Sequence, residues 1–553
     1  MTNKTISTTV HGYKFAASGV ALTITSTGKV TGSSSAGDAA IYGAAARTGE
    51  SILNLGAVSG GSYLYGIVLD GGGSVTNGNA THKTAAISST GTAIRVTSHA
   101  GTVTNSGSIT GDLDNGKGVR LDAGGVITNG SATDTTARVS AYVAVDMYGV
   151  GKVTNFGTLK GQVNLYGGGV VTNAATGVIV SREAMYFGGA ASTLTNLGTI
   201  TGQVKFGSGQ VVNGSKTDHT AFIGAGGGNY GIYVGTGTLT NFGTISGTED
   251  AVAMQDKTVL IAEAGSKLLG GSSYGQGATF VFGAAGGAGT ISGLGTSITG
   301  STTAKFRDLS KYGVQAGASW TFSGTNTLKA ADSLVVDGTL SLASSLLGSG
   351  KLSVAKGGTI KSAASVKGVV QIQSAVANAG LLIAAGGTLE LDKGVTGAGS
   401  ARISTGTLFA AGAFSEAVQF TGTTGTLELA HGQTFTGKIT GFAKTGAESL
   451  DLKDIAFGAK TKATFTGTAA GGTLTVTDGT HTAKIALLGN YVGNTFKAAT
   501  DGSGGTKIVD QTTKAATSQF VSAMAGMGDV GGGSMSPRHE AAPTTTLLAH
   551  PRE

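Results

Sequence analysis

Carboxylates are the side chains of this chain best suited to catalysis. Asp70 and Asp122 each precede a glycine-containing turn, and Asp146 follows further along the chain. Carboxylates projected from neighbouring coils would supply the acid and base of a polysaccharide lyase or hydrolase, and Arg120 would neutralise an anionic sugar. The equivalent later turn carries Tyr166 instead, which leaves a carboxylate pair without a third partner. Such a pair is typical of turn capping, so we expect no enzyme and keep a polysaccharide-active enzyme built on Asp70, Asp122 and Arg120 as the alternative.

Metal and thiol chemistry have little support in the sequence. The chain has no cysteine, which excludes disulfides, thiolate metal sites and thiol nucleophiles. Its eight histidines are scattered and show no zinc-binding spacing. Asp218 and His219 would make an acid–base pair, but they lie in a Ser- and Thr-rich insertion that we interpret as a solvated loop. We expect no metal and no cofactor.

Aromatic side chains offer a second kind of contact. Tyr148, Tyr166, Tyr186 and Tyr233 recur just before or within glycine-rich turns. Aromatic rings in such places can stack on sugars or on a partner surface. Packing at the core or edge of the fold is the interpretation that we favour.

A repeated phrase indicates the elements that carry these side chains. It reads Val-Thr-Asn-Ser-Gly at 103–107 and Val-Thr-Asn-Phe-Gly at 153–157, and a second form follows glycine clusters, as at 167–173. The asparagines of successive copies are Asn54, Asn77, Asn105, Asn129, Asn155, Asn173, Asn196, Asn213 and Asn241. Alternating apolar and polar residues bounded by Gly and Asn are typical of strands.

The spacing of the asparagines predicts the fold class. The intervals are irregular but close to two dozen residues, which is one coil of a parallel β-solenoid whose loops absorb insertions. We predict an all-β, right-handed parallel β-helix solenoid with a small C-terminal β cap and a loose tail. The asparagines are expected to be structural, either in turns or as a ladder of stacked side chains that hydrogen-bond between coils.

Composition agrees with many tight turns and few charges. The 553 residues include 98 glycines and three prolines, only 12% of them are charged, and the net charge is +7. A hydrophobic content of 40% argues against a disordered chain, and glycine without a three-residue period argues against collagen. No concentrated basic face is evident, so we expect no nucleic-acid partner, and no apolar run is long enough for a transmembrane helix.

The pattern divides the chain into five segments. We predict an N-terminal cap and first coils at 1–40, the Asn/Gly-repeat solenoid at 41–265, and a less regular solenoid at 266–440. A C-terminal β cap is expected at 441–510, where Thr-Asp-Gly-Thr at 477–480 predicts a hairpin. Residues 511–553 are expected to form a flexible tail.

Phrases such as Leu-Thr-Asn-Phe-Gly-Thr-Ile-Ser-Gly at 239–247 resemble the passenger regions of autotransporters and related large secreted β-helix surface proteins of Gram-negative bacteria. The resemblance covers about 40–440, and it implies a solenoid fold and an extracellular or cell-surface location. The chain shows no translocator barrel of long alternating strands and no N-terminal secretory signal, so we expect a secretion signal in the tail.

Together these features predict a secreted or cell-surface structural or adhesive protein. Its expected partners are other copies of itself, in a filament or layer, or a surface polysaccharide or host surface. The alternatives are the polysaccharide-active enzyme and a carbohydrate-binding adhesin.

Overall fold

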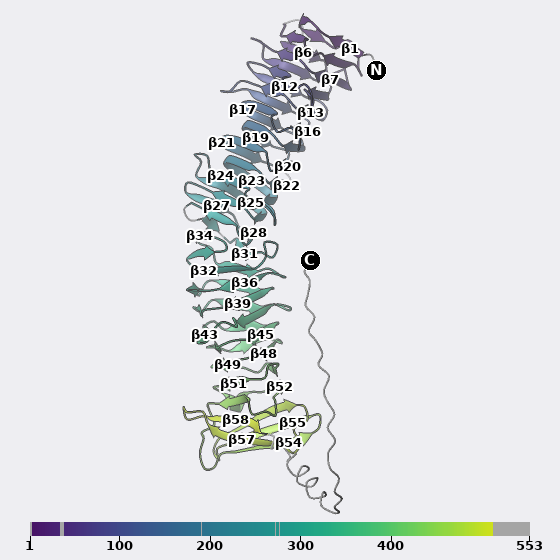
Figure 1. Ribbon diagram of the computed structural model, residues 1–553. Helices are drawn as coiled ribbons and strands as arrows, with labels where there is room; N and C mark the ends of the chain where they lie inside the picture. The colour runs from purple at the N-terminus through teal and green to yellow at the C-terminus, as the bar shows by residue number, and fades with distance from the viewer. Residues whose placement is uncertain (1–2, 34–37, 190, 271–272, 276, 512–553) are drawn as a thin grey trace, which may run out of the picture.

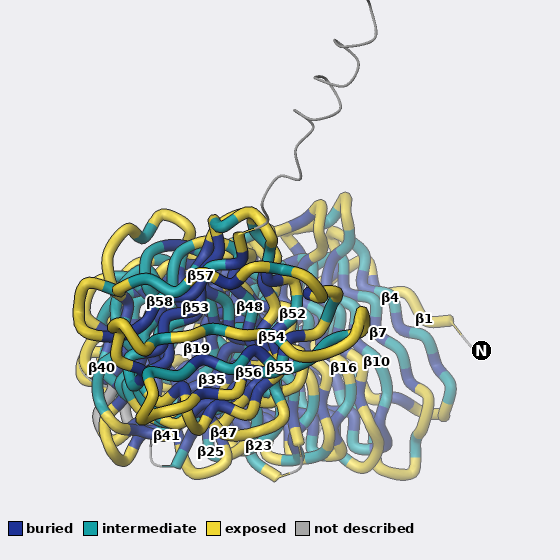
Figure 2. The backbone as a smooth tube through the Cα atoms, turned by 90° about the horizontal axis from the view of Figure 1, so that it is seen from below, coloured by how far each residue is buried: buried dark blue, intermediate teal, exposed yellow. Residues whose placement is uncertain are grey.

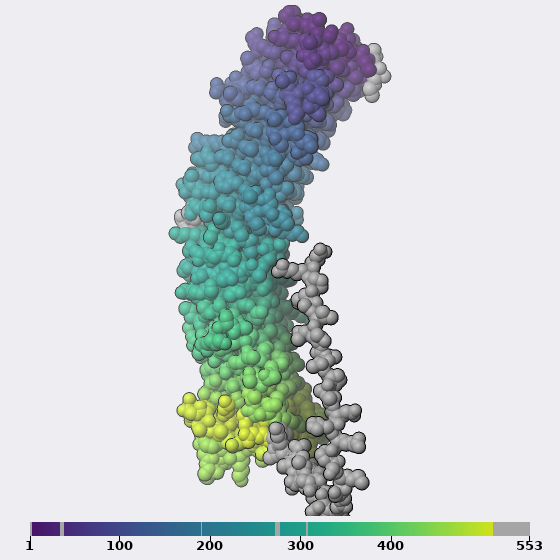
Figure 3. Space-filling view, in the orientation of Figure 1, coloured from purple at the N-terminus to yellow at the C-terminus, as the bar shows by residue number. Residues whose placement is uncertain are grey.

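The computed structural model describes residues 3–33, 38–189, 191–270, 273–275 and 277–511. These residues form a parallel β-solenoid of about 20 turns, which confirms the predicted fold class. Figures 1 and 3 show a slender, gently curved rod that runs from the N-terminal coils to a yellow C-terminal cap. With coils stacked at the ~4.8 Å strand spacing, 20 turns make a rod roughly 95 Å long.

The coil has three faces, each a ladder of parallel strands. The first face begins with β1 pairing with β4 and runs along most of the rod. Its strands are β1 (Asn3–Ile6), β4 (Ala21–Ile24), β7 (Glu50–Asn54), β10 (Gly73–Asn77), β13 (Gly101–Asn105), β16 (Gly125–Asn129), β18 (Gly151–Asn155), β20 (Gly169–Asn173), β22 (Ser192–Asn196), the ends of β23 (Thr199–Asn213) and β25 (Tyr230–Asn241), β28 (Thr258–Ala262), β31 (Thr279–Phe282), β35 (Lys311–Val314), β38 (Ser333–Val336), β41 (Lys351–Val354), β44 (Val376–Asn378) and β47 (Val395–Thr396).

The second face of the N-terminal half contains shorter strands. They are β2 (Thr9–His11), β5 (Lys29–Thr31), β8 (Ala57–Ser59), β11 (Ala86–Ser88), β14 (Ser108–Thr110), the starts of β17 (Arg138–Met147), β19 (Thr158–Leu165), β21 (Val178–Phe187) and β23, then β24 (Phe222–Gly224), β26 (Thr244–Ser246) and β29 (Lys267–Leu269).

The third face of the N-terminal half positions the candidate site. Its strands are β3 (Tyr13–Lys14), β6 (Ala39–Gly43), β9 (Tyr65–Leu69), β12 (Thr92–Val96), β15 (Lys117–Leu121), the ends of β17, β19 and β21, the middle of β23, the start of β25, then β27 (Asp250–Met254), β30 (Ser273–Gly275) and β34 (Ala304–Arg307). In β17, β19, β21 and β23 the second and third faces belong to one continuous strand, and the corner between them is a register shift instead of a loop.

The core fills the space between the three faces. Alternate residues of each strand point inward, and equivalent positions stack in register, as Val103, Ile127, Val153 and Val171 do on the first face. All four are fully buried. Figure 2, which looks along the rod, shows buried residues in the interior and exposed residues around the rim. Burying each such side chain stabilises the folded state by roughly 1.5–3 kcal/mol.

The ladders of two faces change near the middle of the rod. There β33 (Ser297–Gly300) pairs antiparallel with both β32 (Gly289–Ser292) and β34. The only tryptophan, Trp320, is fully buried at this level, packs on Phe282 with ring centroids 5.1 Å apart, and donates from its indole nitrogen to the carbonyl of Gly283 at 2.8 Å. This aromatic core joins the two halves of the solenoid.

Two new ladders continue below this level. One contains β32, β36 (Ser319–Phe322), β39 (Thr339–Leu342), β42 (Thr359–Ser362), β45 (Leu381–Ala384), β48 (Ser400–Ile403), β50 (Ala417–Phe420) and β52 (Lys438–Thr440). The other contains β37 (Asn326–Thr327), β40 (Leu346–Leu347), β43 (Val369–Ile372), β46 (Thr388–Leu391), β49 (Thr407–Ala410), β51 (Gly425–Leu429) and β53 (Glu448–Leu452). A 3₁₀ turn, η2 (Gly432–Thr434), interrupts the last coil.

Antiparallel strands cover the last coil. β54 (Lys462–Thr468), β55 (Gly471–Thr477) and β56 (Thr482–Leu488) form a meander whose last strand pairs with β52. The β55–β56 connection confirms the hairpin expected at 477–480. β57 (Thr495–Thr500) and β58 (Thr506–Gln511) close the other ladder against β53. The tail and secretion signal predicted for 511–553 lie outside the described residues, apart from Gln511.

Glycine is required where a coil turns onto its first face. Gly169 has a φ of +135°, and a Cβ there would lie 2.0 Å from the backbone oxygen of Gly151 in the preceding coil. Only a residue without a side chain fits this backbone conformation and this close approach. The glycine clusters of the repeat are therefore a requirement of coil stacking.

Candidate binding face

The nine repeat asparagines form one continuous ladder inside the rod. Each closes a first-face strand, and each is fully buried. The side-chain Nδ2 of each of the first eight donates to Oδ1 of the next, at 2.7–2.9 Å, from Asn54 through to Asn241. These amides are out of contact with solvent, so their role is to hold one corner of the coil together.

Each asparagine also ties down the backbone of the following turn. Asn155, for example, donates to the carbonyl oxygens of Gly157 at 3.1 Å and Val178 at 3.2 Å. A Cβ on Gly157 would lie 2.1 Å from the carbonyl oxygen of Ala137, which explains the glycine two residues after the asparagine. The repeated phrase thus encodes a tightly packed corner in which the asparagine amide and the carbonyl groups that it binds are hydrogen-bonded.

The candidate carboxylates lie on the outer side of the third face, in separate environments. Asp122 accepts from the guanidinium groups of Arg95, at 3.0 Å, and of Arg120. Asp70 accepts from the hydroxyl of Thr97 at 3.2 Å, and the strand register places Thr97 between Asp70 and Asp122. The structure therefore brings Asp122 and Arg120 together and leaves Asp70 two coils away.

Asp146 occupies a neighbouring position but is buried. Its carboxylate is 1% exposed and pairs with the ammonium group of Lys117. The register aligns Asp146 with Arg120 on one side and Asn164 on the other. The cations of these coils are therefore already neutralised by carboxylates.

Three tyrosines continue this surface as a stack of rings. The Arg120 guanidinium lies 4.8 Å from the ring centroid of Tyr148, the Tyr148 and Tyr166 centroids are 5.0 Å apart, and those of Tyr166 and Tyr186 are 5.5 Å apart. The three side chains remain 39–44% exposed. Burial against its neighbours, together with the Asp146 charge, raises the pKa of the Tyr166 phenol. The stack fixes the orientation of the last ring, Tyr186.

A hollow begins where the stack ends. Tyr148 and Tyr166 occupy equivalent positions in successive coils of the third face. The next two coils have Gly188 and Gly207 at that position. A Cβ on Gly207 would have one neighbour within 4 Å, a carbonyl oxygen at 3.1 Å. Because no side chain rises there, the row of rings does not continue at that position.

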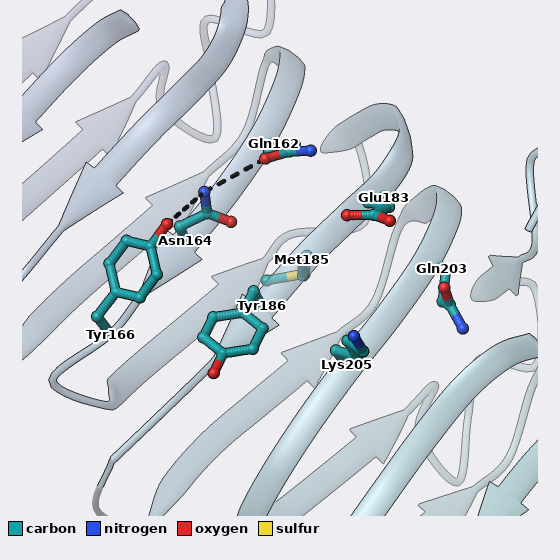
Figure 4. Close-up of a pocket in the computed structure, with 8 residues that line it drawn as sticks. All are labelled: Gln162, Asn164, Tyr166, Glu183, Met185, Tyr186, Gln203 and Lys205. Carbon is teal, nitrogen blue, oxygen red and sulfur yellow. Dashed lines mark hydrogen bonds between the residues drawn. The ribbon is translucent and has the colours of Figure 1, made fainter.

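Polar side chains from three adjacent coils line this hollow of about 250 Å³ (Figure 4). Gln162 and Asn164 come from β19, Glu183 from β21, and Gln203 and Lys205 from β23. Asn164 Nδ2 donates weakly to Gln162 Oε1 and to the Tyr166 hydroxyl, both at 3.4 Å. Amide, carboxylate, ammonium and ring thus converge on one surface depression.

A second hollow of about 290 Å³ adjoins the first and shares Glu183, Gln203 and Lys205 with it. Arg182, from β21, and Tyr230, from the start of β25, also line it. Neither Arg182 nor Lys205 forms an ion pair with another residue that the structure describes. The two hollows together make a groove across β19, β21, β23 and the start of β25, which we call the third-face groove.

Sequence reasoning found the tyrosines of this groove but missed its polar residues. Asn164, Tyr186 and Lys205 share one register position, although they share no residue type. Their common placement is obscured because register shifts after Lys160 and Val180 break the regular alternation of the strands. Their distances to the next repeat asparagine also differ, so the repeat gives no signal that would have aligned them. Tyr233 continues the same register position beyond Lys205.

Other groups with catalytic potential lie apart from the groove. His219 bonds through Nδ1 to the carbonyl oxygen of Phe242 at 2.8 Å, while Asp218 accepts from the hydroxyl of Thr220. Among the described residues no three His, Asp or Glu side chains are placed to hold a metal ion. The described part of the chain also has no helix long and apolar enough to cross a membrane.

The chain matches no known protein-family model, no curated protein and no solved structure. The fold itself therefore defines the class, which is a capped, three-faced parallel β-solenoid. Within that class the third-face groove is the surface on which polar and aromatic groups converge.

Proposed function

We propose that this protein is a secreted or cell-surface structural and adhesive protein that acts as a stiff rod. The observation that carries the proposal is the parallel stack of about 20 coils, joined through a continuous core. Because each coil pairs along its whole length with the next, bending would require many strand hydrogen bonds to distort together. A rod of this kind holds a binding surface away from the point where it is attached.

The composition supports an extracellular setting. The chain has no thiol to oxidise, few charges and a repeat that resembles secreted surface solenoids. The antiparallel cap covers the strand edges of the last coil, and covered edges do not recruit further strands. Assembly into a filament or layer would then proceed mainly through the sides of the rod.

Microscopy of the purified chain tests the structural part of this proposal. Size-exclusion chromatography over a range of concentrations, followed by negative-stain electron microscopy, should show rods that associate side by side as concentration rises. Discrete monomers at every concentration would refute assembly. Antibody labelling of intact cells tests the location, and labelling only after permeabilisation would refute a surface role.

Carbohydrate-binding adhesion is the form of this function that the third-face groove favours. The groove presents a fixed ring, side-chain amides and charged groups in a surface depression, as sugar-binding sites do. A glycan array probed with the labelled chain tests it. If the labelled chain binds no glycan on the array, the adhesive part of the proposal is refuted and the rod is a purely structural element.

The enzymatic alternative has a direct test as well. Asp122 lies between two guanidinium groups and forms ion pairs with both, so its carboxylate is held by protein side chains in a structural role. We therefore expect incubation with polyuronates to produce no unsaturated ends. Release of such ends, with loss of the activity in Asp122→Ala, would overturn the non-enzymatic proposal.

A further inference from the structure

We propose that the third-face groove binds an anionic oligosaccharide, with a carboxylate of the sugar chain held by Lys205 and Arg182. The inference rests on the proposed adhesive function and names its ligand class. It depends on three features of the groove: its uncompensated cations, its one open aromatic face and its continuous, rigid floor.

The charge of the groove selects the ligand. Above the groove, Arg95, Arg120 and Lys117 are paired with carboxylates. Within it, Arg182 and Lys205 are exposed and form no ion pair with a described residue. Glu183 is the one carboxylate among the lining residues, so the two cations leave the groove with an excess of positive charge. An unpaired ammonium and guanidinium beside one hollow bind a carboxylate better than a neutral hydroxyl, because charge-assisted hydrogen bonds are the stronger ones.

The aromatic stack supplies a face for a sugar ring. Tyr148 is covered by Arg120 on one side and Tyr166 on the other, and Tyr166 lies between two rings. Tyr186 ends the row, so one of its faces remains free to line the hollow. The stacked rings hold Tyr186 in place, which reduces the entropy lost when a ligand packs on it.

Neutral polar groups complete the recognition of a sugar. Gln162, Asn164 and Gln203 offer amide donors and acceptors, and Glu183 offers an acceptor, all suited to hydroxyl groups. These side chains stand on β19, β21 and β23, which are continuous strands through the corner of the coil. Because the two hollows share Glu183 and Lys205, the groove accepts a chain of sugars and not a single unit.

The orientation of the bound chain follows from this placement. Tyr186 lies on the side of Lys205 nearer the N-terminus of the rod, and Arg182 and Tyr230 line the far hollow. We infer that one sugar packs beside Tyr186 while a carboxylate reaches Lys205 and Arg182. Peptides with acidic side chains would satisfy the cations but leave the amides and the ring face unused.

Calorimetry with matched sugars tests the proposal on the full chain. The probes are uronate hexasaccharides of mannuronate, guluronate, galacturonate and the glucuronate–N-acetylglucosamine repeat, each beside its carboxyl-reduced, neutral counterpart. We expect at least one uronate to bind at micromolar to sub-millimolar concentration and its neutral counterpart to bind about tenfold more weakly or not at all. Raising the salt concentration should weaken uronate binding.

Variants locate the binding on the groove. Lys205→Gln should weaken uronate binding by about 10- to 100-fold, the loss typical of a hydrogen bond to a charged group, and Lys205→Arg should restore most of it. Tyr186→Ala should weaken binding about three- to tenfold. Lys152→Gln removes an exposed lysine from the first face and should leave binding unchanged. All these side chains are exposed, and circular dichroism checks that each variant is folded.

Several results would overturn the proposal. They are no binding to any uronate of the panel, equal binding of the carboxyl-reduced sugars, unchanged binding by Lys205→Gln, or binding of hexaglutamate in place of the uronates. Each leaves the rod and its surface location untouched, since microscopy and cell labelling measure those separately. Conversely, a chain that binds uronates in vitro but is not exposed on cells would refute only the adhesive function.

Discussion

Removing one rung from the asparagine ladder should destabilise the rod by an amount that depends on the position of the rung. In Asn155→Ala, the Oδ1 of Asn173 loses the donor that lies 2.8 Å away, and no other residue that the structure describes donates to this buried oxygen. The Nδ2 of Asn129 loses its partner Oδ1 but keeps the carbonyl oxygen of Thr158 at 3.1 Å. A buried polar atom left without a partner costs about 1–3 kcal/mol, and the lost amide leaves a small void. We expect a total of about 3 kcal/mol.

The last rung provides the comparison. Asn241 accepts from Asn213 at 2.9 Å, but the next coil has Ala262 in the equivalent position, so no side chain beyond depends on Asn241. Its own donation to the carbonyl oxygen of Lys267 is long, at 3.3 Å. Asn241→Ala should therefore cost only about 1–2 kcal/mol. Thr154→Ala, on the outward side beside Asn155, is the matched control and should cost less than about 1 kcal/mol.

An isosteric change separates the hydrogen bond from the packing. In Asn155→Asp, the carboxylate accepts from Asn129 but cannot donate to Asn173, and it is buried without a counter-ion. Burial raises the folded-state pKa of such a carboxyl above its unfolded value of about 3.9. The variant should be least stable at neutral pH and should recover on acidification, when the protonated carboxyl can donate to Asn173.

Urea denaturation and native-state hydrogen exchange measure these effects. Coils of a solenoid unfold with their neighbours, so the loss of protection in Asn155→Ala should centre on the coils that contain Asn129 and Asn173. Equal costs for Asn155→Ala and Asn241→Ala would refute the reasoning. An Asn155→Asp variant whose stability does not improve between pH 7 and pH 4 would show that the donated bond contributes little.

Three further changes probe other parts of the rod. Burial raises the pKa of Glu416 to about 7, so its own contribution should lower stability by about 3 kcal/mol as the pH rises from about 4.5 to 7, where this carboxyl is ionised only in the unfolded chain. Other buried carboxyls, such as Asp451 with a pKa raised to about 6, add to the slope, so Glu416→Gln should remove about 3 kcal/mol of the pH-dependent change in urea titrations and leave the rest. Trp320→Ala should lower the free energy of unfolding by about 3–5 kcal/mol, because Trp320 is fully buried. In the native chain the fluorescence of Trp320 should have its maximum at short wavelength and shift to the red only when the middle of the rod unfolds, and a red shift before that transition would contradict the packing found there. Gly169→Ala, at a φ of +135°, should lower the melting temperature sharply, whereas Gly368→Ala, with no atom within 4 Å of the new Cβ, should leave it unchanged or raise it, and equal effects would contradict the steric argument.

The repeated phrase was sufficient to predict the fold because coil geometry acts on a few local positions. An asparagine that closes each strand and a glycine two residues later are required by the corner itself, as at Asn155 and Gly157. Such requirements recur once per coil, so they are visible in the sequence without knowledge of any long-range contact. The irregular spacing of the asparagines did not hide them, because loops between the strands absorb the difference.

The sequence alone determined the parallel solenoid, the stacking register through the asparagines and the terminal hairpin. Only the tertiary structure decided which outward side chains meet. Asp122 lies with Arg95 and Arg120 but not with Asp70, and Asn164, Tyr186 and Lys205 share one hollow although they come from three successive coils. The physical reason is that the loops and register shifts within each coil, such as those after Lys160 and Val180, decide which outward side chains become neighbours in adjacent coils. Core positions repeat because packing demands it, whereas the third-face groove is formed by side chains that no repeat constrains.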